Sequence, residues 1–503
     1  MSLMERPQSW NSATLESLLV HVIGGDWGKP PDHEEPGYQT VACIRGSEFR
    51  NWRNESGRTA VPRTVKANSL EKRSLVPGDI LLEISGGGPD QPVGRTVLIN
   101  QSVLDQFATP VIGTNFLRLL RPSAGLDQRF LNRYLEFFYS SGEVIRYQGG
   151  SNNLRNLKFK DYSQIPLPIP PLAEQKVIAD KLDTLLAQAD NTKARLERIP
   201  QILKRFRQSV LAAAVSGGLT EEWRSTSADK PKEPSEGKER FKSDLFDSAC
   251  ESLPAIPTSW LIVPAAKVLE YVTSGSRGWS RYYSDNGSLF LRMSNVRYDT
   301  TSLDLNDLQY VQLPENVEGK RSLVEKDDLI VSITADVGRV ARIDNDLGEA
   351  YVNQHLALLR PTSDIHSEYF ATCIAAVNVG MKQVSTFKRG ATKAGLGLDD
   401  IRSLAIPFPS FKEQTEIVRR VDQLFAHADR IEQQVNNALA RVNTLTQSIL
   451  AKAFRGELTE QWRQDHPDLI SGENSAEALL ERIKAERAAA APAKRTRKTK
   501  RRG

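Results

Sequence analysis

The sequence has few cysteines and no long apolar segment. Its 503 residues include three cysteines, Cys43, Cys250 and Cys373, which lie far apart and lack the paired spacing of a metal site. We therefore expect ordinary thiols in a reducing compartment, which indicates the cytoplasm. No apolar run approaches the ~18 residues that cross a bilayer, so no membrane partner is expected. The opening residues, MSLMERPQSW, lack the basic-then-apolar pattern of an export signal.

The motifs of common catalytic and cofactor sites are also missing. The sequence contains no GxxxxGK(S/T) phosphate loop, no GxGxxG after an expected strand and no HExxH zinc motif. The six histidines are dispersed, and none has a cysteine or carboxylate at ligand spacing. We therefore predict a chain without catalytic residues, without a metal and without a cofactor of its own.

Positive charge is concentrated near one end of the chain. The formal net charge is +5, and the segment KRTRKTKRR, from Lys494 to Arg502, carries seven positive charges, which leaves 5 − 7 = −2 for the rest. A globally basic surface is therefore absent, and contact with nucleic acid would depend on local patches or on this tail. Two interpretations of the tail stay open, a solvated chain end or a segment that contacts phosphates.

What the sequence does contain is a long internal repeat. A shift of 239 residues aligns 165–224 with 404–463 without a gap, and 21 of the 60 positions are identical. The phrase GGLTEEWR, ending at Arg224, thus returns as GELTEQWR, ending at Arg463. Weaker similarities precede both copies, such as CIRGSEFR with FLRMSNVR and PGDILLEIS with KDDLIVSIT. A divergent domain followed by a better-matched segment therefore occurs twice.

The better-matched segments, 171–224 and 410–463, have the heptad period of a coiled coil. Apolar residues follow 4-3-4-3 spacing over about five heptads in each copy. Pro200 should kink or restart the first helix, whereas Leu439 leaves the second continuous. We predict antiparallel packing of the two helices, with the domains at opposite ends in a pseudo-twofold arrangement. The residues expected in the seam between the helices include Leu182, Leu185, Leu196, Leu203, Val421, Leu424, Val435 and Leu445.

The repeated phrase is expected to end each helix. Gly217 and Gly456 follow the last periodic turn, where a residue in the left-handed conformation would terminate the helix. A short helix should follow, with N-caps at Thr220 and Thr459. Two interpretations remain open for the tryptophans of the phrase, docking on the end of the coiled coil or contact with a partner protein. These residues are Trp223 and Trp462.

The large domains that precede the two helices are expected to be α+β heads. Both 1–170 and 251–409 show short β-rich runs with turn signals and one helical piece. Between the copies, 225–250 has the composition of a linker, with 11 charged residues. Residues 464–503 add a short helix and the basic tail.

One acidic pattern in the first head resembles a catalytic pair. Asp79 and Glu83 have suitable spacing, but the second copy keeps only Asp328. A strand that follows a turn explains both copies better, so we assign no catalytic role to these carboxylates.

Basic residues cluster beside aromatic residues in both heads. Arginine and lysine bind phosphates and arginine can read guanine, whereas asparagine and glutamine can read adenine. Each arginine alone is explained more simply as a solvated surface residue, and the recurrence in both heads is what favours DNA binding. The candidates are Arg45, Arg50 and Arg53 in the first head, and Arg277, Arg281, Arg292, Arg297, Lys388 and Arg389 in the second.

These features together resemble a known family. The run IPLPIPPLAEQKVIADKLDTLLAQAD, the later FRQSVLAAAVSGGLTEEWR and the second copies of both are similar to the specificity subunit of type I restriction–modification systems. The resemblance covers residues 1 to about 465. It implies that each head is a target recognition domain for one half of a split site in double-stranded DNA. It further implies that the helices set the gap and hold two methyltransferase subunits.

The same resemblance assigns the chemistry to partner subunits. The methyltransferases would bind S-adenosylmethionine and methylate adenine N6 on a flipped base, and a motor–nuclease subunit would use ATP and Mg²⁺. This chain would supply the DNA sequence specificity. Two other hypotheses stay open, a scaffold that binds proteins through its coiled coil and ignores DNA, and a self-contained nuclease. The lack of an acidic cluster repeated in both heads disfavours the nuclease.

Overall fold

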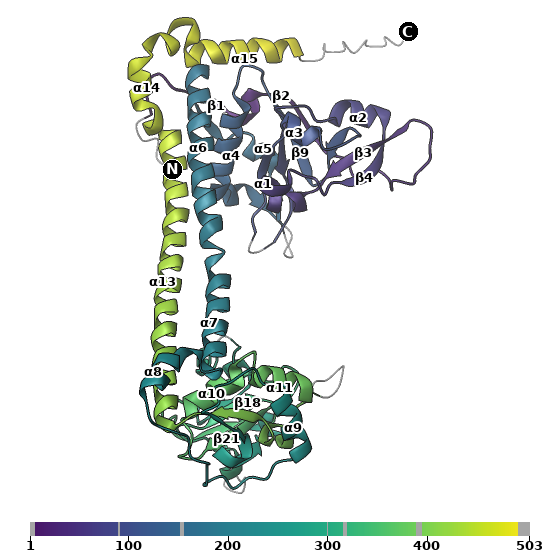
Figure 1. Ribbon diagram of the computed structural model, residues 1–503. Helices are drawn as coiled ribbons and strands as arrows, with labels where there is room; N and C mark the ends of the chain where they lie inside the picture. Colours follow the sequence, from purple (N-terminus) through teal and green to yellow (C-terminus); the bar gives the residue numbers. More distant parts are fainter. Residues whose placement is uncertain are drawn as a thin grey trace, which may run out of the picture. The chain divides into compact units, whose positions relative to one another are not determined.

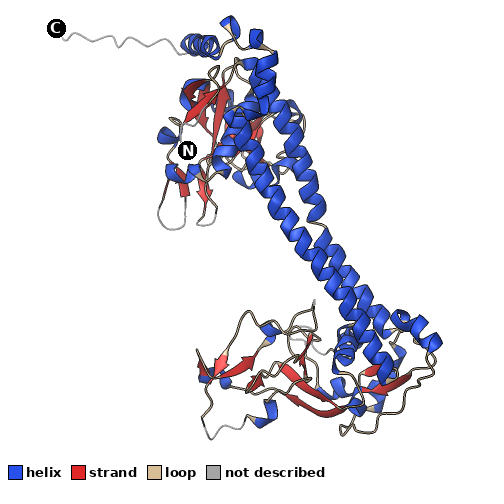
Figure 2. Cartoon of the chain, turned by 90° about the vertical axis from the view of Figure 1, so that its left-hand side faces the viewer, coloured by secondary structure: helices blue, strands red, loops and turns tan. Residues whose placement is uncertain are grey.

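The chain forms two compact units, Met1–Arg195 with Ala438–Gly503, and Leu196–Asn437. Each unit joins one head to parts of the long helices, and the strands gather in the heads (Figures 1 and 2). Among the helices that can be described, none has the length and apolar character of a membrane span. The computed structural model describes residues 6–88, 91–150, 155–298, 300–314, 319–388 and 395–490.

The two repeated helical segments differ in continuity, as Pro200 predicts. The first segment breaks into α6 (Leu172–Leu196) and α7 (Ile199–Val215), with Pro200 in the first turn of α7. A proline is tolerated there because the first N–H groups of a helix have no partner within it. The second segment, α13 (Phe411–Arg455), is one continuous helix.

The helices run antiparallel in each unit. In the second unit, Arg420 of α13 donates to the Leu219 carbonyl at 2.6 Å, and Arg207 of α7 pairs with Glu432 at 2.8 Å. The contacts thus pair rising residue numbers in α13 with falling residue numbers in α7 and the turn after it. In the first unit, the start of α6 lies at the end of α13, where Ile178 and Phe454 share one core.

Seven of the eight residues predicted in the seam are buried or partly buried. Leu445 is the exception, because 54% of its surface is exposed, and its placement in the seam is wrong. Near its end α13 buries Phe454 instead, whose ring lies 5.1 to 5.7 Å from three aromatic rings of α4 (Gln128–Ser140). Near the end of α13, packing against head 1 therefore buries a different face of the helix from the one that the heptad spacing predicts. The buried ones are Leu182, Leu203, Val421 and Val435, and the partly buried ones Leu185, Leu196 and Leu424.

Head 1 is the part of the first unit that precedes α6, and it contains two main sheets. The first sheet is antiparallel, in the order β2 (Leu19–Gly24), β9 (Leu117–Pro122), β5 (Ile80–Glu83), β7 (Thr96–Leu98). The second has the order β4 (Val61–Lys66), β3 (Tyr38–Ile44), β8 (Val111–Gly113), in which β3 and β8 are parallel. Smaller sheets pair β1 (Asn11–Thr14) with β12 (Pro166–Ile169), and β6 (Ser85–Gly87) and β10 (Gln148–Gly149) with β11 (Arg155–Leu157).

Head 2 lies between α8 (Glu221–Thr226) and α13, and it repeats this plan. Its antiparallel sheet has the order β14 (Leu269–Ser274), β21 (Leu356–Pro361), β18 (Leu329–Ser332), β19 (Val340–Arg342). A second sheet has the order β15 (Tyr283–Ser284), β17 (Tyr310–Val311), β16 (Ser288–Leu291), β20 (Ala350–Val352), with β16 and β20 parallel. The pair β13 (Leu261–Pro264) and β22 (Ala405–Phe408) corresponds to β1 and β12.

Short helices complete the two units. Head 1 adds α1 (Trp52–Glu55), α2 (Ala67–Arg73), α3 (Gln101–Leu104) and α5 (Phe159–Tyr162). Head 2 adds α9 (Ser243–Glu251), α10 (Ser367–Ala375), α11 (Gly380–Phe387) and α12 (Leu398–Arg402). After α13 come α14 (Glu460–Asp465) and α15 (Ala476–Ala490), and α15 packs on head 1 through Leu479 and Ile483.

The central strands β5 and β18 are apolar because each is covered on both faces. Ile80 and Leu82 face the core shared with α4 and α6, whereas Leu81 faces a second core. The acidic residues directly before these strands, Asp79 and Asp328, form hydrogen bonds within the fold. Asp79 accepts from Arg121 at 2.7 Å through each oxygen, and Asp328 accepts from Arg360 at 2.9 and 2.8 Å. A structural role therefore explains both carboxylates.

Candidate nucleic-acid interface

The two best-matched arginine clusters lie on equivalent turns in the two heads. Arg45 follows β3, and its backbone N–H donates to Glu48 at 2.5 Å. Arg292 follows β16, and its N–H donates to Asn295 at 2.8 Å. The similar sequences CIRGSEFR and FLRMSNVR thus form the same turn in the two heads, and in each head the turn starts at an arginine.

The side chains on these turns differ in their ionic partners. Arg50 is exposed and has no ion pair or hydrogen bond with a described residue. Its counterpart Arg297 pairs with Asp304 at 3.0 Å, and Arg292 pairs with Asp307 at 2.9 Å. The Arg45 guanidinium also pairs with a carboxylate, that of Glu48 at 2.5 Å, so the two turns differ only at Arg50, which lacks among the described residues the carboxylate partner that Arg297 has.

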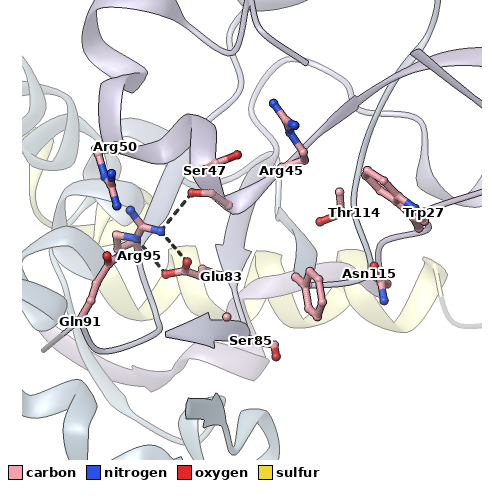
Figure 3. A pocket seen from close by; sticks show the side chains of 13 residues that line it. Trp27, Arg45, Ser47, Arg50, Glu83, Ser85, Gln91, Arg95, Thr114 and Asn115 are labelled. Atoms are coloured by element: carbon pink, nitrogen blue, oxygen red, sulfur yellow. Dashed lines mark hydrogen bonds and ion pairs between the residues drawn. The ribbon is translucent and has the colours of Figure 1, made fainter. Parts of the chain in front are cut away.

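The turn of head 1 borders a cavity of about 660 Å³ (Figure 3). Arg50 and Arg95 lie on one side of it, and Trp27 lies on the other. Arg95 donates to Glu83 at 2.9 and 2.5 Å and to the Gly46 carbonyl at 3.0 Å. Burial lowers the pKa of Arg95, but the hydrogen bonds and the charge of Glu83 outweigh burial and raise it. A cationic, aromatic-flanked hollow of this kind suits the edge of a nucleic acid.

The other predicted cations of head 2 are spread over separate places. Arg277 is exposed, and Arg281 lies over the ring of Tyr282 at 4.8 Å. Trp279, which lies between them in the sequence, is 6% exposed and packs on Phe290 at a ring distance of 5.6 Å. Lys388 is exposed directly after α11, and Arg389 lies outside the described residues.

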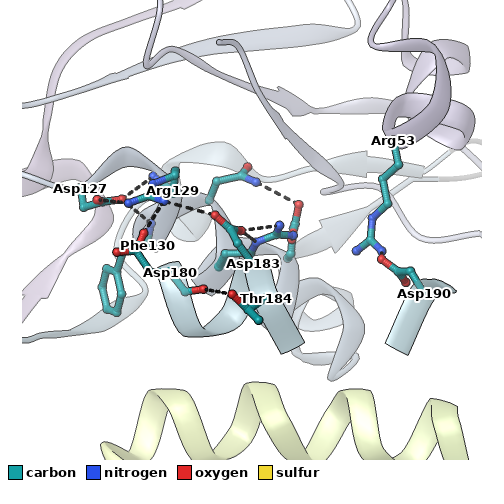
Figure 4. Close-up of polar contacts among 11 residues, drawn as sticks. Arg53, Asp127, Arg129, Phe130, Asp180, Asp183, Thr184 and Asp190 are labelled. Carbon is teal, nitrogen blue, oxygen red and sulfur yellow. Dashed lines mark hydrogen bonds and ion pairs between the residues drawn. The ribbon is translucent and has the colours of Figure 1, made fainter. Parts of the chain in front are cut away.

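Arg53 contacts the long helix instead of the hollow of head 1. It forms an ion pair with Asp190 of α6 (Figure 4). Arg129 of α4 also pairs with α6, through Asp180 at 2.7 Å and Asp183 at 3.3 Å. These pairs lie between head 1 and α6, so Arg53 belongs with the contacts that attach the head.

A buried glutamate at the start of a long helix adds a further attachment in each unit. In the first unit, Glu174 accepts from Trp10 at 2.8 Å and from Thr459 and Arg463 at 2.6 Å each. We call these four residues the first clasp. They explain why the phrase returns, because the Thr and Arg of GELTEQWR, which follow α13 and belong to the start of α14, bind the start of α6.

The second unit contains the same arrangement. Glu413 accepts from Trp260 at 2.9 Å, from Thr220 at 2.8 Å and from Arg224 at 2.6 Å, and these residues form the second clasp. Thr220 stands at the N-cap position, as predicted, but its hydroxyl makes no capping bond and serves Glu413. Sequence analysis missed the clasps, although the similarity of ERPQSW and AIPTSW carried a signal for the two tryptophans.

The glycines of the repeated phrase behave as predicted, and its tryptophans are partly buried. Gly217 and Gly456 end their helices with φ of 80° and 81°, as predicted. Trp223 and Trp462 are half-buried, and Trp462 stacks on His466 at a ring distance of 4.9 Å. The contact of these tryptophans with a partner protein stays a prediction.

Comparison with known proteins assigns the family. The family model described as the type I restriction modification DNA specificity domain matches residues 64–201 and 289–441. The chain is 36% identical over 506 residues to the EcoKI specificity subunit of Escherichia coli strain K12, which covers 99% of this chain and 100% of that relative. The chain belongs to the type I restriction–modification specificity family. It is therefore a DNA specificity subunit.

Two further comparisons agree with this family. The EcoBI specificity subunit of Escherichia coli is 42% identical over 374 residues, which cover 74% of each chain. Among solved structures, the HsdS subunit from Thermoanaerobacter tengcongensis has a TM-score of 0.52 at 16% identity, covering 91% of this chain and 99% of that one. This likeness shows that the specificity subunit shares its fold with the solved protein.

Proposed function

We propose that the two heads of this specificity subunit bind the two halves of a split DNA site through their arginine turns. The observation that supports this is the equivalence of Arg45 with Arg292 and of Arg50 with Arg297 on matching turns. Phosphate contacts by such residues position a protein on the duplex. Because the two arginine turns differ in their side chains and ionic partners, the half-sites should differ, unlike the palindromes that true homodimers read.

The paired helices α6, α7 and α13 are the proposed platform for two methyltransferase subunits. The contact points we propose are the half-buried Trp223 and Trp462 and the exposed Leu445. The methyltransferases, with S-adenosylmethionine, and a motor–nuclease subunit, with ATP and Mg²⁺, would carry out the chemistry. The chain itself would act without catalysis in the cytoplasm, and the binding of Asp79 by Arg121 and of Glu83 by Arg95 supports a non-catalytic role.

Single-molecule methylation sequencing tests this function in a host with and without the gene. We expect one bipartite motif with methylated adenines that disappears when the gene is deleted. An unchanged methylome would contradict the proposal, and so would a continuous motif that has no gap of unspecified bases between two halves.

The scaffold hypothesis is tested by the double variant Arg50→Glu with Arg297→Glu, purified with the methyltransferase. Loss of the motif from an intact complex supports DNA reading by the heads, and an unchanged motif supports the scaffold.

A further inference from the structure

A three-residue turn occupies the same place in both heads and was not singled out by the sequence. Residues 114–116 connect β8 to β9 in head 1, and residues 353–355 connect β20 to β21 in head 2. The Leu117 N–H donates to the Thr114 carbonyl at 2.9 Å, and the Leu356 N–H donates to the Asn353 carbonyl at 3.1 Å. We call these two segments the reading turns.

The backbone fixes each reading turn beside the arginine turn of its head. The Thr114 N–H donates to the Ile44 carbonyl at 2.9 Å, directly before Arg45. The Asn353 N–H donates to the Leu291 carbonyl at 3.0 Å, directly before Arg292. Both hydrogen bonds follow a parallel strand pair, so the reading turn extends from a rigid sheet edge in each head.

A glycine holds each reading turn in close approach to the neighbouring strand. A Cβ atom on Gly25 would lie 2.1 Å from the Thr114 carbonyl oxygen, and one on Gly275 would lie 2.1 Å from the Asn353 carbonyl oxygen. Any other residue would displace the turn. Both heads therefore keep the same close backbone contact, whereas no residue of one turn is identical to its counterpart in the other.

Those side chains include buried polar atoms without partners. The Oγ1 atom of Thr114, a residue that is 2% exposed, has no hydrogen-bond partner among the described residues. In head 2, the Oε1 atom of Gln354 is buried and equally without a partner in the described part of the chain. Such atoms are costly in a folded protein unless a ligand or water satisfies them.

The exposed members of the turns have the chemistry that distinguishes bases. Asn115 is exposed and lies with Thr114 on the Trp27 side of the cavity, and the neighbouring Phe116 is 50% exposed (Figure 3). In head 2, His355 is exposed and bonds to Thr334 through Nδ1 at 2.6 Å. A carboxamide binds adenine at N6 and N7, and an apolar ring contacts the thymine methyl group.

We propose that the reading turns are the base-reading elements of the heads, Asn115 and Phe116 in head 1 and Gln354 and His355 in head 2. This inference rests on the proposed function. Arg45 and Arg292 contact the phosphates next to each turn, which places the turn at the base edges. The two turns carry Thr-Asn-Phe and Asn-Gln-His, so each head reads a different half-site.

Isosteric variants test the proposal without removing volume. Asn115→Asp and Gln354→Glu replace a donor and an acceptor by acceptors alone, which favours cytosine N4 over adenine. The full chain, assembled with its methyltransferase subunits, is used to select duplexes from a randomised double-stranded DNA library. We expect Asn115→Asp to reduce the preference for adenine about tenfold at one position of one half-site. Gln354→Glu should do the same only in the other half-site.

The two variants control each other, and a third controls for substitution of an exposed asparagine. Asn68→Asp lies on α2, outside both reading turns, and should leave both half-sites unchanged. If the wild-type complex selects no bipartite motif, the proposed function fails. If it selects one and neither variant changes a base preference, or both weaken binding equally on all sequences, the assignment of the reading turns is overturned.

Discussion

Arg463 donates to the Glu174 carboxylate at 2.6 Å although 289 residues separate them, and Arg224 contacts Glu413 at the same distance. In each clasp the short segment that follows one long helix binds the start of the other. This contact requires antiparallel helices, and it also holds the buried tryptophan that begins each head. The repeated phrase is therefore the part of the chain that closes each unit.

Glu174→Gln should destabilise the first unit by about 3 kcal/mol. Glu174 is fully buried, and its loss would leave the Arg463 guanidinium buried without a counterion. Urea unfolding of the full chain, followed by hydrogen exchange of the segments around Trp10 and α14, measures the change.

The matched control is Glu457→Gln in the same unit. Glu457 pairs with Arg455, and both side chains are more than 40% exposed, so the change should cost far less stability than Glu174→Gln. Equal effects of the two substitutions would show that the clasp contributes no more than a surface pair.

The Glu368 side chain should contribute a loss of stability in the second unit as the pH rises from about 4.5 to about 7. Burial, and then the neighbouring carboxylate of Asp422, raise the pKa of Glu368 from 4.5 to about 7, although Arg342 acts in the opposite direction. The folded state therefore binds more protons than the unfolded state in this window, so deprotonation favours unfolding. Urea midpoints across this range should show the decline, and Glu368→Gln should flatten it.

Glu270→Gln provides the comparison for this pH profile. A hydrogen bond from Lys238 lowers the pKa of Glu270, so this group titrates below the window. Its substitution should leave the slope between pH 4.5 and 7 as in the wild type. A slope in Glu368→Gln that equals the wild-type slope would refute the assignment to Glu368.

Arg50→Ala should weaken DNA binding by a similar factor on every sequence. An exposed cation that contacts a phosphate contributes through counterion release, so the slope of log affinity against log salt should fall by about 1. Fluorescence titration of the methyltransferase-bound complex between 50 and 200 mM salt (about the range in which this effect is large) measures the slope. Lys484→Ala on α15 removes a cation outside the heads and should leave the slope unchanged. An unchanged slope in Arg50→Ala would exclude this phosphate contact.

Deletion of one heptad from α6 and one from the facing part of α13 should shorten the gap between the half-sites. Seven helical residues span about 10.5 Å, and the DNA rise of ~3.4 Å per base pair converts this to about three base pairs. Methylation sequencing should show both half-sites unchanged around a shorter gap. A change in the half-site sequences would contradict a spacing role for the helices.

Features that depend on a few neighbouring residues were predictable from the sequence. The ring of Pro200 restarts the helix, and Gly217 and Gly456 adopt the left-handed conformation, because both effects act within one helical turn. Heptad spacing predicted most of the seam. It failed at Leu445, since α4 lies far away in sequence and its aromatic rings draw Phe454 to the buried side.

The ionic and polar partners that join the heads to the helices were not predictable, because they lie far apart in the sequence. Nothing local links Trp10 to Glu174, or Arg53 to Asp190, and Trp279 could not be recognised as a core residue before Phe290 was placed beside it. The reading turns escaped notice for the opposite reason, since their side chains differ between the copies and only their backbone contacts repeat.

The sequence by itself determined the duplication, the long helices and the absence of familiar catalytic motifs, because repeats, heptads and motifs are patterns along the chain. The tertiary structure decided which charges are neutralised, which aromatic residues are buried and which polar atoms lack partners. These properties depend on distances across the fold, and in this chain the deciding contacts connect residues such as Glu174 and Arg463 that only folding brings together.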